Sequence, residues 1–424
     1  MAAIACTPTA GTKTRPSSSQ ASANPPCTPR ARAQSSTRQA VGPIGMPWPP
    51  PDLPVPSSRQ HAVLSPRAEP LTESKKRIIT IGIESEFELD PRYEDGKRAT
   101  LAEFVAALAI EHNHLVPSRH PRMQTFIKRK DSSQYAKWCM AEEPSITVAG
   151  RPCPPWTIEM ISPILVAYPG SKWREDVEAT WKYLQDQYHI TTNRRCSTHI
   201  HLSLDPFYTT PEIKRIAQAC IYFEPAFEAI VPPVRRFNAY AKSNWLDSPT
   251  VAREDRSRSE LIAAIEGAVQ VDVIARLMQY RGDREYAWNF WALFRRRTIE
   301  FRKPPACTRP EEVLAWAELA LSFIQACIKY ENTTQLQKVP PTIGGLRWFL
   351  SQFTEAGVNE PKRMQRLWWG RSANAMVQPY PQPVGFWAWE VAARSAMIER
   401  LKRLREAEMK QSLVLARRGR APFW

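Results

Sequence analysis

The feature that most constrains the fold is a strict two-residue alternation along residues 196–204, CSTHIHLSL. Successive side chains of a β-strand point to opposite faces, so this segment predicts a strand with one oily and one polar face. The polar face carries two of the chain's seven histidines, His199 and His201. Two imidazoles on one face are either packed and hydrogen-bonded in a core or hold a ligand.

Three other segments divide in the same way: IGIESEFEL (81–89), TIEMISP (157–163) and RRTIEFR (296–302). Three glutamates within five residues of the first segment repel one another unless cations lie among them. Carboxylates together with histidine suit Mg²⁺ or Mn²⁺. The polar faces of these three segments carry Gly82, Glu84, Glu86, Glu88, Glu159, Arg296, Thr298, Glu300 and Arg302.

Two simpler interpretations stay open at this point. A solvent-exposed sheet face would also be polar, and a packed histidine pair needs no ligand. Cys196, His199 and His201 could also bind zinc as C-x-x-H-x-H, although Cys196 points to the opposite face of a regular strand.

Composition limits the remaining classes. The net charge is +16, but residues 1–77 contribute +7 and residues 371–424 contribute +6, so the basicity says little about the centre of the chain. We therefore expect neither a nucleic-acid partner nor a membrane partner. The apolar run at 313–328 is too short for a bilayer and contains Glu318. The eight cysteines form no CxxC pair, which favours reduced thiols and an intracellular, cytoplasmic location.

Three regions are predicted along the chain. Residues 1–75 contain 14 of the 39 prolines and few large apolar residues, so we expect a disordered basic tail. Residues 76–370 are expected to form the main folded domain, and residues 371–424 a basic helix and tail. Strands are expected at 77–89, 156–165, 196–204, 286–294 and 296–302, and helices at 99–113, 171–188, 211–230, within 250–282, at 309–330 and at 387–418. Alternating strands favour an α+β fold with an antiparallel or mixed sheet and helices on one face.

The ordered set GIESEFE, TIEMISP, CSTHIHLSL, FEPAFEAIVPPVRRFN and TIEFR, followed by EEVLAWAELALSFI, resembles the amidoligase family. That family belongs to the carboxylate–amine/ammonia ligases, which include glutamine synthetase and glutamate–cysteine ligase. The resemblance covers about residues 78–330. It implies a curved, largely antiparallel sheet like the glutamine synthetase catalytic domain, and a site for ATP and Mg²⁺ or Mn²⁺.

The resemblance also implies roles for individual residues. Glu84 would share one metal with His199 and Glu300, and Glu86 would serve a second metal with Glu159. His201 would lie near the nucleotide phosphates, and Arg302 would contact the transferred phosphoryl group. The catalytic residues would be Glu84, Glu300 and Arg302. Candidates for substrate or phosphate contact are Arg236, Asn238, Arg284 and Asn289.

The chain departs from the family pattern at two places. Ser197 stands where the family usually has glycine, and Glu143 precedes Ser145 where the family often has aspartate. No G-x-x-x-x-G-K-[ST] or G-x-G-x-x-G motif is present, so bound phosphates would not be held by a P-loop or a dinucleotide turn.

Three functions fit these observations. The first is an ATP-dependent ligase that joins a small-molecule or peptide carboxylate to an amine through an acyl phosphate. The second is a metal-dependent hydrolase, and the third is an inactive scaffold protein with the same fold. Because glutamine synthetase relatives form rings, a homo-oligomer is left open.

Overall fold

The computed structural model of the chain describes residues 77–93, 98, 100–125, 135–142, 146, 154–236, 238–248, 251, 256–280, 282–330 and 336–378. Segments 1–75 and 387–418, as well as Glu143 and Ser145, lie outside these residues. The strands of the described part are β1 (Ile78–Pro91), β2 (Met123–Gln124), β3 (Trp138–Glu142), β4 (Trp156–Ile161), β5 (Leu165–Ala167), β6 (Tyr188–Thr191), β7 (Thr198–Asp205), β8 (Trp288–Asn289) and β9 (Ile299–Phe301).

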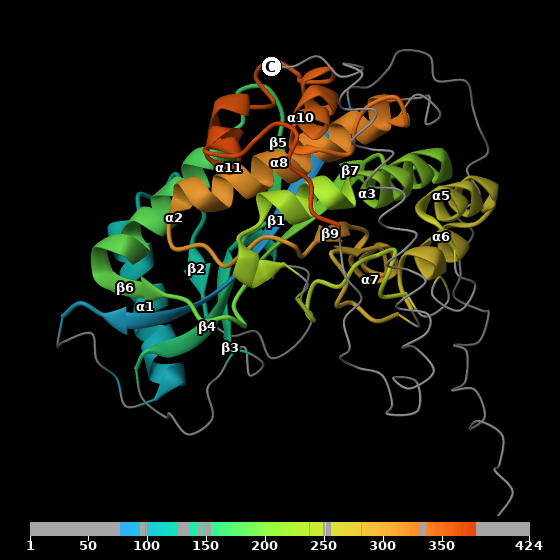
Figure 1. The fold of residues 1–424 in the computed structure, drawn as a ribbon. Helices are drawn as coiled ribbons and strands as arrows, with labels where there is room; N and C mark the ends of the chain where they lie inside the picture. Colours follow the sequence, from blue (N-terminus) through green and yellow to red (C-terminus); the bar gives the residue numbers. More distant parts are fainter. Residues whose placement is uncertain are drawn as a thin grey trace, which may run out of the picture. The chain divides into compact units, whose positions relative to one another are not determined.

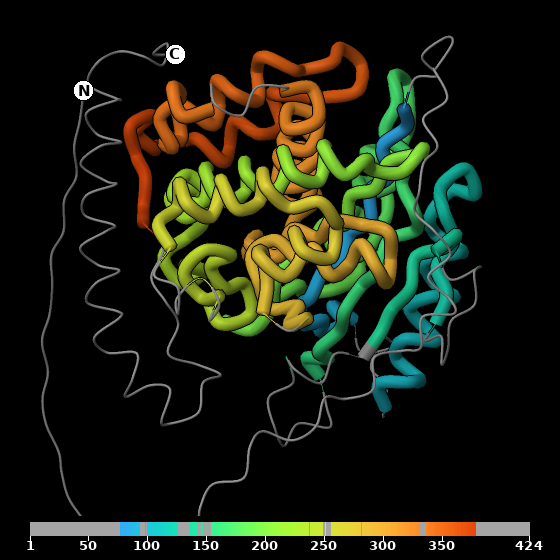
Figure 2. The backbone as a smooth tube through the Cα atoms, turned by 90° about the vertical axis from the view of Figure 1, so that its right-hand side faces the viewer, coloured from blue at the N-terminus to red at the C-terminus, as the bar shows by residue number. Residues whose placement is uncertain are grey.

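These strands form one sheet with β1 at its centre. Its main path runs in the order β2-β3-β4-β1-β7-β9-β8, and β5 and β6 also pair with β1. Every pairing is antiparallel except β2 with β3. Figure 1 shows β1 in blue among strands from later in the chain, and Figure 2 shows the same arrangement from the side. The described residues therefore have a mixed α+β fold with a largely antiparallel, unclosed sheet.

The helices were expected on one face, and the longest ones cover the apolar face of the sheet. Helix α8 contacts β1 and β7 and also packs against α2 and α3. The helices are α1 (Leu101–Leu115), α2 (Trp173–Gln187), α3 (Thr210–Ile230), α5 (Arg258–Gly267), α6 (Val271–Met278), α7 (Ala292–Arg296), α8 (Pro310–Lys329), α10 (Ile343–Ser351) and α11 (Gln365–Trp368), with 3₁₀ turns η3 (Pro233–Arg235) and η4 (Pro361–Met364).

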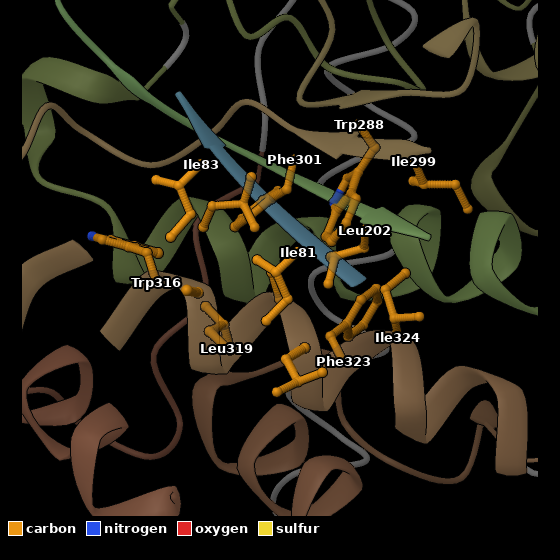
Figure 3. Close-up of a cluster of buried hydrophobic side chains, with 14 of the residues drawn as sticks. Ile81, Ile83, Leu202, Trp288, Ile299, Phe301, Trp316, Leu319, Phe323 and Ile324 are labelled. Atoms are coloured by element: carbon orange, nitrogen blue, oxygen red, sulfur yellow. The ribbon is translucent and has the colours of Figure 1, made fainter. Parts of the chain in front are cut away.

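The hydrophobic core fills the layer between the sheet and α8 (Figure 3). Ile81 and Ile83 of β1 and Leu202 of β7 point toward this helix, and all three are fully buried. Trp288 and Phe301 stack with their ring centroids 4.2 Å apart. Burial of this apolar face leaves the opposite face of the same strands to the polar residues.

Local sequence explains where several helices begin. Thr100 and Glu103 form a capping box at the start of α1, and Ser257 and Glu260 form another at α5. In a capping box, each side chain accepts a hydrogen bond from a backbone N–H that the first helical turn leaves unpaired. Helix α8 begins at Pro310, whose missing N–H costs nothing at that position.

The predicted helices at 99–113, 171–188, 211–230 and 309–330 agree with the structure, whereas the predicted strand at 156–165 is divided into β4 and β5 and the one at 296–302 is limited to β9. The largest difference lies near residue 290. Residues 286–294 were predicted as a strand, but only Trp288–Asn289 pair in the sheet, and Ala292–Arg296 form the short helix α7. The prediction was wrong because aromatic residues favour strands by propensity, whereas the tertiary structure requires a reversal of the chain here. The backbone reverses at Arg297, which adopts a left-handed conformation with φ 56°.

Two expectations from composition can be compared with the described residues. Among their helices, none combines the length and the apolar character that a bilayer crossing requires. Cys139, Cys196, Cys220, Cys307 and Cys327 are all free thiols.

A buried polar cluster connects the loop at 241–248 to helix α3 and strand β8. Asn244 accepts a hydrogen bond from the N–H of Trp288 (2.9 Å) and donates its own N–H to Glu224 of α3 (3.1 Å). One turn later in α3, Glu228 forms a buried ion pair with Lys303. Because Lys303 directly follows Arg302, this ion pair fixes the end of β9.

Glu224 is the member of this cluster with an unusual charge state. Burial first, and then repulsion by Glu228, raises the pKa of Glu224 to about 7, despite the nearby Arg258 and Lys303. Between pH 4.5, the pKa of the unperturbed carboxyl group, and about pH 7, Glu224 is therefore protonated in the folded protein but ionised in the unfolded chain. This contribution to stability is present below pH 4.5 and is lost as the pH rises through about 7.

We predict that Glu224→Gln stabilises the protein at pH 8 by up to about 3 kcal/mol, because the amide needs no proton to be neutral. The advantage should disappear below about pH 5, where wild-type Glu224 is also neutral. Urea unfolding at both pH values measures this difference. The exposed Glu175 of α2 provides the control, since Glu175→Gln should show no such pH dependence. An equal effect of Glu224→Gln at both pH values would contradict the prediction.

Candidate metal and nucleotide site

The pairing register of four strands brings the predicted polar residues to one place. In the β1–β7 pair, Glu84 lies opposite His199 and Gly82 lies opposite His201. His201 in turn lies opposite Glu300 of β9. On the other side of β1, Glu86 lies opposite Glu159 of β4. Directly opposed residues of an antiparallel pair share a face, so these polar side chains converge.

The centre of the site consists of two glutamates and two histidines, all buried. Nδ1 of His199 lies 3.4 Å from Glu84 Oε2 and 3.8 Å from Glu300 Oε1. Nε2 of His201 lies 3.3 Å from Glu84 Oε1 and 3.6 Å from Glu300 Oε1. Each histidine therefore faces both carboxylates. Neither ring lies in a hydrocarbon environment, which argues against a simple packed pair.

Two overlapping groups in the described residues have the geometry to hold a metal ion. One consists of Glu84, His199 and Glu300, and the other of Glu86, Glu159 and His199; within each, the donor atoms lie within 4.8 Å of one another. Hard carboxylate oxygens and one imidazole are ligands that Mg²⁺ or Mn²⁺ accepts. The donor set therefore fits the ions that the resemblance implies.

Zinc held through Cys196 finds no support in this geometry. Cys196 belongs to neither group of candidate ligands. Burial raises the pKa of its thiol to about 11, which disfavours the thiolate that zinc requires.

Two arginines neutralise the buried carboxylates. Arg302 Nη1 donates to Glu300 Oε1 (2.6 Å) and lies 3.4 Å from His199 Nδ1. Arg296 donates to Glu84 Oε1, and the same Nη1 lies 3.2 Å from His201 Nε2. The sequence placed Arg296 on a strand, but it reaches the site from the end of α7.

The neighbouring histidines and arginines determine the charge of the two carboxylates. Burial alone would raise the pKa of Glu84, but His201, His199 and Arg296 hold it well below its usual value. For Glu300, burial is again opposed, by His201 and Arg302, and the pKa falls to about 2. Both side chains are therefore carboxylates at neutral pH, the form that binds a cation.

Ser197 links the two candidate groups. Its hydroxyl lies 2.7 Å from Glu86 Oε2 and 2.7 Å from His199 Nε2, and its backbone N–H donates to the same Oε2 (2.8 Å). The sequence placed Ser197 on the polar face but identified it only as a departure from glycine. No pattern of residue spacing shows that its hydroxyl contacts both neighbours.

A cavity lies over this cluster, and its empty space, including the part that is open to solvent, is about 620 Å³. The cavity is lined by Glu84, Glu86, Glu159, Arg195, Ser197, His199, Tyr240, Arg284, Glu285, Arg296 and Arg302. Sequence reasoning did not nominate Arg195, Tyr240 or Glu285, although each lies within two residues of a nominated residue or motif.

Other nominated residues lie elsewhere. Arg236 donates from Nε to the carbonyl of Glu228 (3.0 Å), and Asn238 accepts the N–H of Tyr240 (2.8 Å); neither lines the cavity. Asn289 donates to Glu300 Oε2 (2.6 Å), so it orients a candidate ligand. His201 also lies behind the cavity lining, where its Nδ1 contacts Thr298 Oγ1 at 3.0 Å.

We predict that Mn²⁺ raises the melting temperature of the protein and that Glu84→Gln largely removes this shift. At 100 times its Kd, a bound ion stabilises the folded state by about 2.7 kcal/mol. Differential scanning fluorimetry measures the shift. Glu88→Gln is the matched control, because Glu88 lies on the same face of β1 but contacts Thr191 and Asn193 and belongs to neither group. A shift of equal size in both variants would refute the assignment.

Comparison with known proteins agrees with this geometry. Residues 77–324 match the family described as "Putative amidoligase enzyme", and this match covers more than half of the chain. It includes β1, β4, β7 and β9, which carry all five candidate ligands. No curated protein matches the chain. The chain belongs to the amidoligase family.

Proposed function

We propose that this protein is an ATP-dependent ligase that joins a carboxylate to an amine through an acyl-phosphate intermediate. One observation carries the proposal: two overlapping groups of candidate cation ligands share His199, and Glu84, Glu86, Glu159 and His199 line one cavity with Arg302. Membership of the amidoligase family supports a ligase. A buried anionic cluster without Arg296 and Arg302 would suit a cation but not a phosphoryl group.

The reaction explains why such a site needs both acids and arginines. A carboxylate oxygen attacks the γ-phosphorus of ATP, and ADP leaves. The amine then attacks the acyl carbon, phosphate leaves, and the nitrogen loses a proton. The first step gathers negative charge from the carboxylate and the triphosphate, so positive charge must be in place beforehand. Mg²⁺ or Mn²⁺ held by Glu84, His199 and Glu300 and by Glu86 and Glu159 would supply part of that charge.

Arg302 is the residue of the chain best placed to contact the transferred phosphoryl group. The guanidinium is buried, and interaction with Glu300 raises its pKa above the usual value in spite of burial, so it is always charged. Its contacts with Glu300 and His199 use Nη1, and Nε lies 3.5 Å from the carbonyl oxygen of Tyr240. In the described part of the chain Nη2 makes no hydrogen bond, so it can contact a phosphoryl oxygen.

The mouth of the cavity is suited to the second substrate. Arg284 and Arg195 are exposed there and can bind an anionic group, and Glu285 can bind a cationic one. Glu285 also pairs with Lys242 at 3.2 Å, which holds its carboxylate in place. We therefore keep Arg284 as a substrate-binding residue and add Arg195 and Glu285 to this role.

We predict that Arg302→Lys lowers the rate of ATP cleavage about 100-fold while Mg²⁺–ATP still binds. Lysine keeps the charge but loses the fork that matches two oxygens. ADP release over a panel of amino acids, small carboxylic acids and amines measures the rate. Positional isotope exchange in ¹⁸O-labelled ATP, with the carboxylate alone, measures formation of the acyl phosphate.

Arg92→Lys is the control, because Arg92 follows β1 and its Nε donates to the carbonyl of Gln185 (3.0 Å), outside the cavity lining. It should keep the wild-type rate. If Zn²⁺ alone stabilises the protein and Mg²⁺–ATP does not, the proposed ligase is wrong. If ATP binds but no carboxylate of the panel supports ADP release or isotope exchange, an inactive scaffold fits better.

A further inference from the structure

The hydroxyl of Ser197 makes two short contacts, but its single proton can be donated in only one of them. Ser197 immediately precedes β7 and its side chain is buried, as are those of Glu86 and His199. Its Oγ is 2.7 Å from Glu86 Oε2 and 2.7 Å from His199 Nε2. A serine hydroxyl has one hydrogen to donate and two lone pairs to accept with.

Counting donors determines the direction of both bonds. A carboxylate can only accept, so the hydroxyl proton of Ser197 must point to Glu86. If it pointed to His199, two oxygen lone pairs would face each other at 2.7 Å. The remaining contact is satisfied only when Nε2 of His199 carries a proton and donates it to Ser197 Oγ. The chain of bonds therefore runs from His199 through Ser197 to Glu86.

This direction affects cation binding because a protonated nitrogen cannot be a metal ligand. The other ring nitrogen, Nδ1, faces Glu84 Oε2 and Glu300 Oε1. We propose that Ser197 is a positioning residue that keeps the proton of His199 on Nε2, so that His199 ligates through Nδ1 and serves the Glu84–Glu300 group alone. The second group then retains only the carboxylates of Glu86 and Glu159. The inference rests on the proposed function, because it concerns the cations of that site.

Ser197 also limits what Glu86 can do. Its hydroxyl and its backbone N–H both donate to the same oxygen, Oε2. A second cation would therefore meet Glu86 mainly through Oε1. Hydrogen bonds to metal ligands fix the tautomer and orientation of those ligands, and their loss lowers metal affinity 10- to 100-fold.

The test combines histidine NMR with cation titration of the full chain. In protein labelled with ¹⁵N-histidine, we expect the signals of His199 in the presence of Mg²⁺ to show a protonated Nε2 and an unprotonated Nδ1. His199→Gln assigns these signals. A proton on Nδ1 with a bare Nε2 in the wild-type protein would overturn the proposal without any further variant.

Ser197→Ala isolates the hydroxyl, because the backbone N–H that holds Glu86 remains. We expect the protected Nε2 proton signal to be lost and the tightest Mn²⁺ site to weaken at least 10-fold, as measured by electron paramagnetic resonance. Ser197→Thr restores a hydroxyl and should restore both properties. Ser203→Ala is the matched control, since Ser203 is on the same face of β7 but donates to the carbonyl of Arg297 (2.6 Å).

The outcomes separate this inference from the proposed ligase. Unchanged Nε2 signals in Ser197→Ala, with the native fold verified by circular dichroism, would overturn the positioning role even if the protein cleaves ATP. Conversely, a protein that binds no Mn²⁺ in any form would overturn the proposed function and with it the consequence for cations. In that case, the spectra of the wild-type protein would still decide the direction of the hydrogen bonds.

Discussion

Antiparallel pairing of β1 with β4 and β7 is the constraint on which the rest of the structure depends. The register sets Glu84 opposite His199 and Glu86 opposite Glu159, while Ile83 lies opposite Ile200 on the other face. A slip of one residue in either pair would turn the ligands into the core and the isoleucines into the cavity. The hydrophobic layer against α8 thus specifies the register and, through it, the geometry of the polar site.

The chemistry of the site follows from charge placed inside this rigid frame. Buried carboxylates such as Glu84 and Glu300 are tolerated only where cations or hydrogen-bond donors compensate them. Here Arg296 and Arg302 do so from the ends of two short elements, and His199 lies between the two candidate groups. The same balance that allows the acids to be buried keeps them ionised, which is the form that the proposed cation sites require.

Much of this arrangement could be predicted from the chain. The alternating faces of β1, β4, β7 and β9, the long helix α8 and the convergence of the five candidate ligands all appear in the structure. Residues 286–294 were misassigned, because the reversal at Arg297 depends on packing and not on propensity. Arg236 was chosen over its neighbour Arg235. In the structure Arg235 is the buried one, and it donates to the carbonyl of Arg302 (2.8 Å).

What the sequence determined by itself is which side chains share a face, since a period of two residues is a local property of a strand. It also determined the helix starts, because capping boxes and first-turn prolines act within four residues. Only the tertiary structure decided how Ser197 bridges Glu86 and His199, how Arg296 reaches Glu84, and which residues line the cavity. Those contacts join residues far apart in the chain or depend on side-chain orientation, which short-range patterns do not encode.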